Sequence, residues 1–407
     1  MNTKKPEHIV CFALPAWEAE YLRSTVELMK ELAANNLVLY VDYAYTISDC
    51  IKGMLGKKAF DWKRLLGFKD RLRKIEGTGD VGLYVLSLPP IFPSFRASSY
   101  RHFQWLNKIN AAFTGYFINT AIKKLGMRNI IGFNSYQPFL GRFWKIDNIT
   151  YKVYYIYDDF TDIPYFRGFA SVEESRFIQE NDLVIVTSDE LKKRKQRMNI
   201  PVEVVNNGVH FQSFFQHIKI NKLNGKYIKT VGYTGTMDSR IDIDLLESVI
   251  ARMQETRFLF VGKVFDQNIY TRLIKYINVC FEPAVATERM PLVLSEINIG
   301  IIPYVCNNLT AAIHPLKVNE YLAMGLPVVM TPFASMGEAD DVVYTARGPK
   351  SFIHCLELAL LEDDEALQQK RIAIAREADW EKRAEQLLDI IIAYREKANV
   401  STTHSQN

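Results

Sequence analysis

His314-Pro-Leu-Lys-Val-Asn-Glu-Tyr-Leu-Ala-Met-Gly-Leu-Pro-Val-Val329 is the segment from which the fold is most directly predicted. Pro315 stands where a helix begins, apolar side chains follow at helical spacing, and Gly325 stands just past the expected end. Pro327 then leads into the apolar run Val328-Val329-Met330, which is typical of a buried strand. The segment therefore predicts a loop, a two-turn helix, a glycine cap and a strand.

The N-terminus of this expected helix is a candidate site for an anion. Unpaired N–H groups and partial positive charge collect at a helix N-terminus, and Lys317 adds a cation there. Glu320, one turn further along, is placed to accept hydrogen bonds from sugar hydroxyls of the same ligand. An ordinary helix–strand unit with one exposed Lys and one exposed Glu is the alternative, and local chemistry alone leaves both open.

Length and composition indicate an ordinary two-domain protein. A chain of 407 residues exceeds what one core usually supports, so we expect two domains of roughly 200 residues. The net charge of +4 is too small to indicate a nucleic-acid partner, and no apolar run has the length of a membrane span. The N-terminus lacks the apolar stretch of a signal peptide, which favours a cytoplasmic protein. Its cysteines are scattered, as expected of reduced thiols: Cys11, Cys50, Cys280, Cys306 and Cys355.

The N-terminal half opens with the pattern of a doubly wound sheet. Two apolar runs, His8–Leu14 and Leu37–Val41, enclose a segment of helical periodicity. The first turn lacks the glycine fingerprint of a dinucleotide-binding loop, so NAD or FAD is not expected there. It offers Trp17, Glu18 and Arg23 instead, and because ligands bind beyond the carboxyl ends of such strands, these three residues are candidates for an acceptor site.

Two acidic residues follow a later strand of the same half. Val153–Tyr157 is an apolar run, and Asp158 and Asp159 come directly after it. Carboxylates at the carboxyl end of a parallel strand lie where active sites form, so both are candidate catalytic residues. Further strands are expected at Asn129–Phe133, Leu183–Thr187 and Val202–Val205.

Two stretches of this half combine basic and aromatic residues. Lys52–Lys74 is strongly basic, and Phe92–Lys124 is a second such stretch. A solvated helical face is one reading of Lys52–Lys74, and a surface that lies against anionic lipid headgroups is the other. Nucleic-acid binding by stacking lacks the support of an RNA-binding motif.

The C-terminal half repeats the strand–helix alternation after a polar stretch. Apolar periodicity is lost from Phe211 to Lys229, which predicts the linker between the domains. A strand at Ile228–Tyr233 then leads into a tight loop with Gly235 and Thr236, and Arg240 at its end is a candidate bidentate donor to a pyrophosphate. Asp242-Ile-Asp244 has the form of a metal–diphosphate motif, but it lies at an expected helix start, where acidic residues are favoured for other reasons.

These motifs together resemble the GT-B glycosyltransferases of the group related to glycosyltransferase family 4, including its teichuronic-acid and capsule type. The resemblance rests first on the C-terminal half and second on the N-terminal half, and it covers most of the chain. The matching stretches are Val231–Gly235, Phe260–Gly262, Gly300–Tyr304, His314–Val329, Pro15–Trp17 with Arg23, Tyr157–Asp159, Ser188, Asn207–Val209 before Phe214, and Trp380–Arg383.

The resemblance implies an α/β GT-B fold, with two Rossmann-like doubly wound domains facing across a cleft. The expected divisions are an acceptor domain at 1–210, a linker at 211–226, a nucleotide-sugar domain at 227–378, a helix crossing back at 379–398 and a disordered tail at 399–407. No cofactor is expected, because the nucleotide-diphosphate sugar is the donor substrate. A saccharide or a lipid-linked molecule is the implied acceptor, and the inner face of the membrane is a possible location.

The resemblance also assigns individual roles. Glu320 matches the second glutamate of the family's E-x7-E motif, which holds the donor ribose. Lys317 and the amides from Pro315 onward would face the pyrophosphate, and Gly235, Thr236 and Arg240 match the opposing phosphate loop. One of the two carboxylates after Tyr157 lies near where the family places a side chain close to the reacting sugar.

One position departs from the family pattern. The first glutamate of E-x7-E would fall at position 312, which is alanine, so sugar specificity and the retaining outcome lose their usual support. Thr310 and His314 are the candidate substitutes. Three alternatives to a metal-independent transferase stay open: a nucleotide-sugar epimerase of the same architecture, a metal-dependent transferase using Asp158 and Asp159, and a non-catalytic sugar-nucleotide-binding scaffold.

Overall fold

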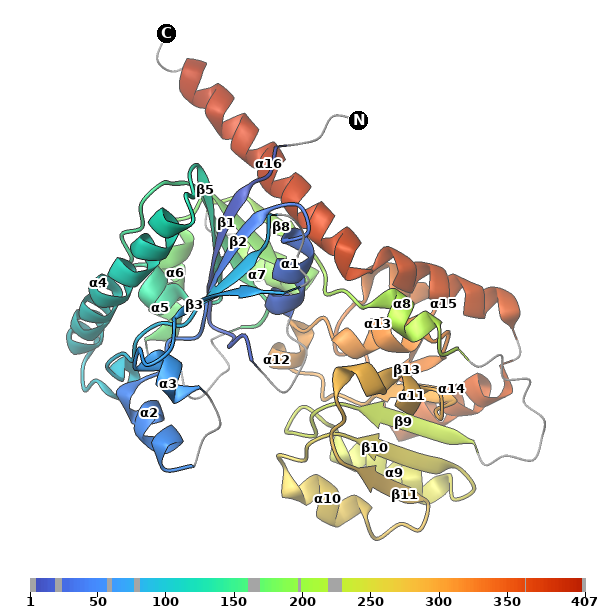
Figure 1. The fold of residues 1–407 in the computed structure, drawn as a ribbon. Coiled ribbons are helices and arrows are strands. Elements are labelled where there is room, and N and C mark those ends of the chain that lie inside the picture. Colours follow the sequence, from blue (N-terminus) through green and yellow to red (C-terminus); the bar gives the residue numbers. More distant parts are fainter. Residues whose placement is uncertain are drawn as a thin grey trace. The chain divides into compact units, whose positions relative to one another are not determined.

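The computed structural model describes residues 5–18, 24–56, 61–76, 81–159, 169–196, 199–218, 229–362 and 364–404. Its contacts divide the chain into two units, Met1–Val205 with Arg383–Asn407, and Asn206–Lys382. Of the residues assigned roles above, Arg23 lies outside the described residues. Each unit is built on one sheet with helices against its faces (Figure 1).

The first unit contains an eight-stranded sheet of order β3-β4-β2-β1-β5-β6-β7-β8. All neighbouring pairs are parallel except β3 with β4, and the chain runs outward from β1 in both directions, as a doubly wound sheet does. The strands are β1 His8–Ala13, β2 Leu37–Val41, β3 Leu72–Ile75, β4 Leu83–Leu86, β5 Ile130–Ser135, β6 Ile149–Ile156, β7 Leu183–Val186 and β8 Val202–Val204. The central strands are buried on both faces, which explains their continuous apolar runs.

Helices follow these strands and cover the sheet. Ser188 caps α7 by accepting a hydrogen bond from the amide of Leu191, and this contact fixes where the helix begins. The helices are α1 Ser24–Leu32, α2 Ile47–Met54, α3 Trp62–Leu65, α4 Tyr100–Lys124, α5 Pro138–Gly141, α6 Ala170–Ile178 and α7 Asp189–Lys195, with a short 3-10 turn at Ser94–Arg96.

The second unit contains a six-stranded parallel sheet of order β11-β10-β9-β12-β13-β14. Strand β9 is the centre from which the order reverses, so the switch point lies between β9 and β12. The strands are β9 Thr230–Thr234, β10 Arg257–Val261, β11 Val279–Glu282, β12 Ile299–Ile302, β13 Val328–Met330 and β14 Tyr344–Thr345. Ligands of such sheets bind at the carboxyl ends beside the switch point.

The helices of the second unit include the two-turn helix predicted after Pro315. Helix α13 spans Leu316–Ala323 and is followed by Gly325 in a left-handed conformation, φ +70°, as a helix-terminating glycine requires. Asp242 caps α9, which is the structural role expected for the first acid of Asp242-Ile-Asp244. The other helices are α8 Phe211–Phe215, α9 Ile243–Arg252, α10 Gln267–Leu273, α11 Met290–Leu294, α12 Asn308–Ala311, α14 Pro349–Leu361 and α15 Glu365–Glu377.

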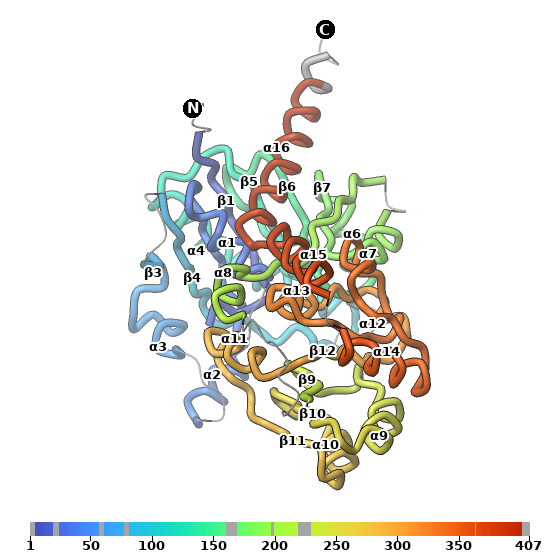
Figure 2. The backbone as a smooth tube through the Cα atoms, turned by 90° about the vertical axis from the view of Figure 1, so that its right-hand side faces the viewer, coloured from blue at the N-terminus to red at the C-terminus, as the bar shows by residue number. Residues whose placement is uncertain are grey.

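Helix α16, Trp380–His404, begins in the second unit and continues in the first (Figure 2). The helix expected at 379–398 starts at Trp380 in the structure, after a break in the chain at Ala378–Asp379. There Val209 pairs with Asp379, and the Asp379 carboxylate accepts hydrogen bonds from the amides of Phe211 and Glu381. The helix runs on to His404, so the start of the predicted tail at 399–407 is helical as far as that residue.

Two further expectations differ from the structure. The predicted linker 211–226 begins with helix α8, whose Phe211 and Phe214 are buried in the core of the second unit. Lys52–Lys74 is not one helical face, because its last residues form β3, antiparallel to β4. None of the described helices is long and apolar enough to cross a membrane.

Gly208→Ala is expected to destabilise the second unit. A Cβ at Gly208 would lie 2.6 Å from Cδ2 of the fully buried Trp380, so the indole must move. Overpacking of this kind costs about 1–3 kcal/mol, and chemical denaturation measures it. Gly115→Ala in α4 is the control, because its Cβ would meet Trp144 at an ordinary 3.8 Å. It should stabilise by roughly 0.5–1 kcal/mol, and equal midpoints for the two variants would contradict the argument.

Candidate functional site

Helix α13 is held on the second sheet by Tyr321. The ring of Tyr321 lies against Gly300 of β12, where a Cβ would come within 2.3 Å of it, so only glycine permits this approach. The Tyr321 hydroxyl lies 3.0 Å from the amide nitrogen and 3.1 Å from the hydroxyl of Thr234, at the end of β9. The helix N-terminus is thereby fixed beside the switch point between β9 and β12.

Lys317 projects from the first turn of α13 between two buried tyrosines. Its ammonium donates hydrogen bonds to the hydroxyls of Tyr304 (2.7 Å) and Tyr233 (3.3 Å), and it lies 4.6 Å from the ring centroid of Tyr233. Burial opposes ionisation of Tyr304, but the charges of Lys317 and Arg240 outweigh it and lower the pKa of this phenol. Lys317 has no ion-pair partner within the described part of the chain, so its charge is available to an anion.

The loop after β9 meets the loop after β12 around Arg240. The Arg240 guanidinium holds Asp238 with two hydrogen bonds of 2.8 and 2.7 Å, and the Arg240 carbonyl accepts from the amide of Val305. Although burial opposes both charges, the pair raises the pKa of Arg240 and lowers that of Asp238. The bidentate face that the sequence assigns to a pyrophosphate is therefore occupied by Asp238 in this structure.

Gly235 and Thr236 lie in the same loop. Gly235 has φ +116°, a conformation that disfavours any side chain, and a Cβ on it would lie in van der Waals contact with the Lys317 ammonium at 3.4 Å. The Thr236 carbonyl accepts a hydrogen bond of 2.7 Å from the Tyr233 hydroxyl. Together these contacts place the glycine loop directly beside the N-terminus of α13.

The backbone at the start of α13 offers two amides. Pro315 is the N-cap residue and has no N–H, so the expected series of amides starts at Leu316 rather than at Pro315. Within the residues that the structure describes, no hydrogen bond uses the amides of Leu316 and Lys317. These two N–H groups and the Lys317 ammonium form the candidate phosphate site.

Glu320 lies one turn further along α13 and is partly buried. Burial raises its pKa from 4.5 to about 7, against the opposing influence of Lys317 and His210. Within the described ranges, no hydrogen bond or ion pair engages its carboxylate. A carboxylate of this kind can accept hydrogen bonds from the hydroxyls of a bound sugar.

The positions around the missing glutamate are buried. The Thr310 hydroxyl donates to the carbonyl of Val305 and takes part in a capping box with Asn307, so it stabilises α12. His314 is 7% exposed, and its carbonyl accepts a hydrogen bond of 2.6 Å from the Asn207 amide group. Ala312 is fully buried. The Thr310 side chain and the His314 backbone therefore both have structural roles.

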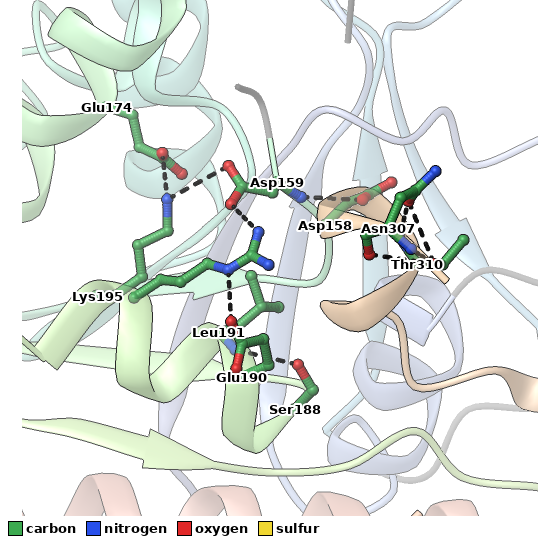
Figure 3. Close-up of polar contacts among 10 residues, drawn as sticks. Asp158, Asp159, Glu174, Ser188, Glu190, Leu191, Lys195, Asn307 and Thr310 are labelled. Atoms are coloured by element: carbon green, nitrogen blue, oxygen red, sulfur yellow. Dashed lines mark hydrogen bonds and ion pairs between the residues drawn. The ribbon is translucent and has the colours of Figure 1, made fainter. Parts of the chain in front are cut away.

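In the first unit, Asp159 belongs to a buried ionic cluster (Figure 3). Its carboxylate lies 3.0 Å from Arg194 and 3.8 Å from Lys195, and Lys195 in turn binds the buried Glu174 at 2.7 Å. Burial raises the pKa of Glu174. Asp158 is more exposed and accepts a hydrogen bond from the Asp159 amide. Of the two candidates, Asp158 is the one whose exposure suits contact with a substrate.

The loop after β1 is fixed to the end of β2. The Trp17 amide donates to the Asp42 carboxylate at 2.8 Å, and burial raises the pKa of Asp42 to about 6 in spite of this bond. Glu18 pairs with Arg73 at 2.7 Å and lines a cavity of only 50 Å³. A cavity of 570 Å³ lies in the same unit, and its lining includes Leu14 and Pro15 of this loop.

Sequence reasoning gave no role to several residues that the structure brings together. Tyr233, Asp238 and Tyr304 flank Lys317 and Arg240, although Tyr233 and Tyr304 lie in the motifs quoted above. Asn107 and Gln137, which line the larger cavity, carry no local signal at all. The tyrosines that flank Lys317 could have been identified by one signal: each lies within or just after a buried strand, near a glycine loop.

Two doubly wound parallel sheets, one bearing a cationic helix N-terminus at its switch point, define the GT-B class of fold. Residues 228–363 match the family model described as glycosyl transferases group 1. This match lies in the C-terminal half of the chain, and it agrees with the glycosyltransferase resemblance inferred from the sequence.

Similarity to individual proteins is more distant. A putative teichuronic acid biosynthesis glycosyltransferase of Bacillus subtilis (strain 168) is 28% identical over 221 residues, which span 51% of this chain and only 56% of the relative. Sucrose-phosphate synthase from Thermosynechococcus elongatus has a similar structure, with a TM-score of 0.69, 13% identity and coverage of 97% and 100% of the two chains. A trehalose-6-phosphate structure from E. coli, bound with UDP-2-fluoro glucose, has a TM-score of 0.65, 11% identity and coverage of 95% and 99%. These structural likenesses show the fold.

Glu320 should make the stability of the protein depend on pH. Because folding raises its pKa from 4.5 to about 7, the folded state binds the extra proton, and stability falls as pH rises across that interval. In the wild type, this fall in the free energy of unfolding should be on the order of 1 kcal/mol. Glu320→Gln should remove it, which would appear as a flatter plot of melting temperature against pH. Glu338→Gln, at an exposed carboxylate of the same unit, should keep the wild-type slope. An unchanged slope in Glu320→Gln would refute the assignment.

Proposed function

We propose that the chain transfers a sugar from a nucleotide-diphosphate sugar to a saccharide or lipid-linked acceptor in cell-surface polysaccharide synthesis. The observation that carries the proposal is the Lys317 ammonium, held by Tyr233 and Tyr304 beside two open amides of α13, with Glu320 one turn away. A diphosphate is the ligand that this combination of charge and N–H groups suits. The teichuronic-acid relative and the structure bound with UDP-2-fluoro glucose support the same assignment.

The chemistry follows from where charge develops. The acceptor hydroxyl forms a bond to the anomeric carbon while the bond from that carbon to the diphosphate oxygen breaks. Lys317 and the amides of Leu316 and Lys317 stabilise the charge on the departing diphosphate. Glu320 accepts hydrogen bonds from the ribose hydroxyls and so orients the donor. Asp158 is the proposed carboxylate that positions the acceptor hydroxyl or supports charge at the anomeric carbon.

Arg240 has a supporting part in this proposal. Because its guanidinium is already paired with Asp238, it contributes little net charge unless the pair opens when a diphosphate binds. It also lies over the ring of Tyr304 at 5.6 Å, and so helps to hold the residue that orients Lys317. The expectation of a metal-independent and retaining reaction remains a prediction from the family.

Loss of the Lys317 charge should weaken donor binding. A panel of nucleotide-sugars is first screened for thermal stabilisation of the wild type, and the most effective compound is then titrated. Lys317→Met should weaken its binding at least tenfold, about 1.4 kcal/mol, and Glu320→Ala should lower both binding and turnover. Lys350→Met, at an exposed lysine in the first turn of α14, is the matched control and should bind as wild type does.

The same assay separates the competing functions. Donor conversion without any acceptor would indicate an epimerase, and donor binding without product in any acceptor mixture would indicate a scaffold. Loss of turnover on chelation would indicate a metal-dependent transferase. Wild-type binding in Lys317→Met would remove the proposed phosphate site.

We also propose that the first unit binds an anionic membrane surface. Of the described basic residues within Lys52–Lys74, four form ion pairs or hydrogen bonds with the protein itself. Arg64 and Lys69 both pair with Asp61, and Arg64 also donates to the Asp70 carbonyl. Arg71 donates to the Leu65 carbonyl, and Arg73 pairs with Glu18. Helix α4 is better suited. It exposes Trp105 (58%), Phe113 (50%) and Tyr116 (70%). Exposed aromatic and basic side chains on one helix are typical of interfacial binding.

The charge around α4 supports this choice. Residues 81–146 contain eight Lys and Arg and neither Asp nor Glu, so the segment is uniformly basic. Arg101, Lys108 and Lys123 are exposed on α4 itself. The loop with Phe68, which is 74% exposed, meets α4 where Arg71 lies 5.0 Å from the Phe117 ring. The two basic-aromatic stretches therefore form one continuous surface.

Charge reversal on α4 should release the protein from anionic vesicles. Arg101→Glu, Lys108→Glu and Lys123→Glu together should lower flotation with phosphatidylglycerol-containing vesicles more than tenfold, because each basic residue contributes about 1 kcal/mol. Reversal of Arg252, Lys263 and Lys350, which are exposed on the second unit, changes net charge equally and should have little effect. Equal flotation of the two triple variants would contradict this placement. It would also be contradicted if the α4 triple variant floated as the wild type does while reversal of Lys63, Arg64, Arg71 and Arg73 abolished flotation.

A further inference from the structure

The first unit contains a cavity of 570 Å³ at the carboxyl ends of its parallel strands. Pro15 follows β1, Tyr43 follows β2, Gln137 follows β5 and Tyr157 follows β6, and all four line the cavity. Ligands of doubly wound sheets bind at this edge. The volume is in the range of sites for small molecules and sugars.

Two buried amide side chains in the cavity lack partners. Asn107 of α4 is 1% exposed and Gln137 is 5% exposed, yet Nδ2 of Asn107 and Oε1 of Gln137 make no hydrogen bond among the described residues. Burying a polar atom without a partner costs about 1–3 kcal/mol, so such atoms point to a missing ligand or water. Here they offer one donor and one acceptor, which is the pair that a sugar hydroxyl can satisfy.

The backbone around these amides is held in place. Asn134 accepts a hydrogen bond from the Gln137 amide and donates one to the Gln137 carbonyl, at 2.9 and 3.0 Å. Asn110 binds the amide and carbonyl of Phe92 in the same way, both at 2.9 Å. The amide of Ile47, at the start of α2, donates to the Ile91 carbonyl at 2.9 Å. The walls are therefore preorganised, and aromatic side chains line them: Tyr43, Phe92, Phe95, Phe139 and Tyr157.

The rim of the cavity is positively charged. Lys52 of α2 and Arg96 of the Ser94–Arg96 turn are exposed, and neither forms an ion pair within the described residues. The acid at the rim, Asp49, is engaged by the amide and hydroxyl of Thr46 in the capping box of α2. Two cations without carboxylate partners favour a ligand that carries a negative charge.

We infer that this cavity binds the acceptor saccharide, and that the acceptor carries a carboxylate or phosphate group. Asn107 and Gln137 bind hydroxyls of the sugar ring, the aromatic walls contact its apolar faces, and Lys52 and Arg96 bind the anionic substituent. This inference rests on the proposed function, because the ligand of the cavity is an acceptor only if the protein transfers a sugar. It moves recognition of the acceptor from Trp17 and Glu18 to these residues.

Binding is tested directly, without turnover, by saturation-transfer NMR on the full chain. The probes are methyl glucoside, methyl glucuronide and glucose 6-phosphate, which distinguish a neutral sugar, a carboxylate and a phosphate. Glucuronide or phosphate should bind at least tenfold more tightly than glucoside. Lys52→Gln with Arg96→Gln should reduce that preference to near unity, whereas Lys350→Gln should leave it unchanged.

Near-isosteric variants separate recognition from folding. Asn107→Leu and Gln137→Met should abolish binding of every probe, yet keep or raise the melting temperature, because the replaced amide atoms have no partner in the free protein. Retained binding in both variants would overturn the site, and equal affinity for all three probes would overturn the anionic acceptor. Thermal stabilisation by nucleotide-sugars does not involve this cavity, so failure here and failure of the proposed donor site are separately visible.

Discussion

The contact between Tyr321 and Gly300 is the constraint on which the candidate donor site depends. The ring can lie against β12 only because position 300 has no side chain, and its hydroxyl then reaches Thr234 at the end of β9. One residue thus joins α13 to both strands at the switch point. Lys317 and Glu320 lie four residues and one residue before it on the same helix, so their positions follow from this anchor. A bulkier residue at 300 would displace the helix and with it both charges.

Charge in this region is divided unequally between two cations. Arg240 is neutralised by Asp238, whereas the described residues hold Lys317 through phenol hydroxyls and aromatic faces. Tyrosine rings hold a cation through their quadrupole without cancelling its charge. The result is a positive centre that is fixed in position before a ligand arrives. Preorganised charge of this kind stabilises a departing diphosphate without further reorganisation.

Much of the fold follows from local patterns, because helices and buried strands are encoded by periodicity and by capping residues. Helix α13, its glycine stop and strand β13 were predictable from His314–Val329, as was the capping role of Asp242. The pairing of Val209 with Asp379 at the break before α16 was not, because the two residues lie far apart in sequence. The antiparallel strand β3 was missed for a similar reason, since its basic residues give no apolar signal.

The candidate site was partly predictable for the same physical reason. Lys317 and Glu320 could be found because both belong to one helix whose N-terminus was recognisable. The partnership of Tyr233 and Tyr304 with Lys317 depends on β9 lying beside β12, and sequence order does not give that neighbour relation. Asn107 and Gln137 could not be found, because a buried amide without a partner is a property of the surrounding packing.

The alanine at position 312 is part of the structure around it. Ala312 is fully buried at the end of α12, beside a Thr310 hydroxyl that is already bonded to the Val305 carbonyl. A glutamate at this buried position would place an ionised carboxylate away from water, at a cost that hydrogen-bonding or charged partners must offset. The second unit therefore keeps the groups suited to a nucleotide and lacks the acidic contact that the family uses for the donor sugar. The proposed specificity for an acidic acceptor lies instead with Lys52 and Arg96 in the first unit, whose charges no carboxylate of the described chain compensates.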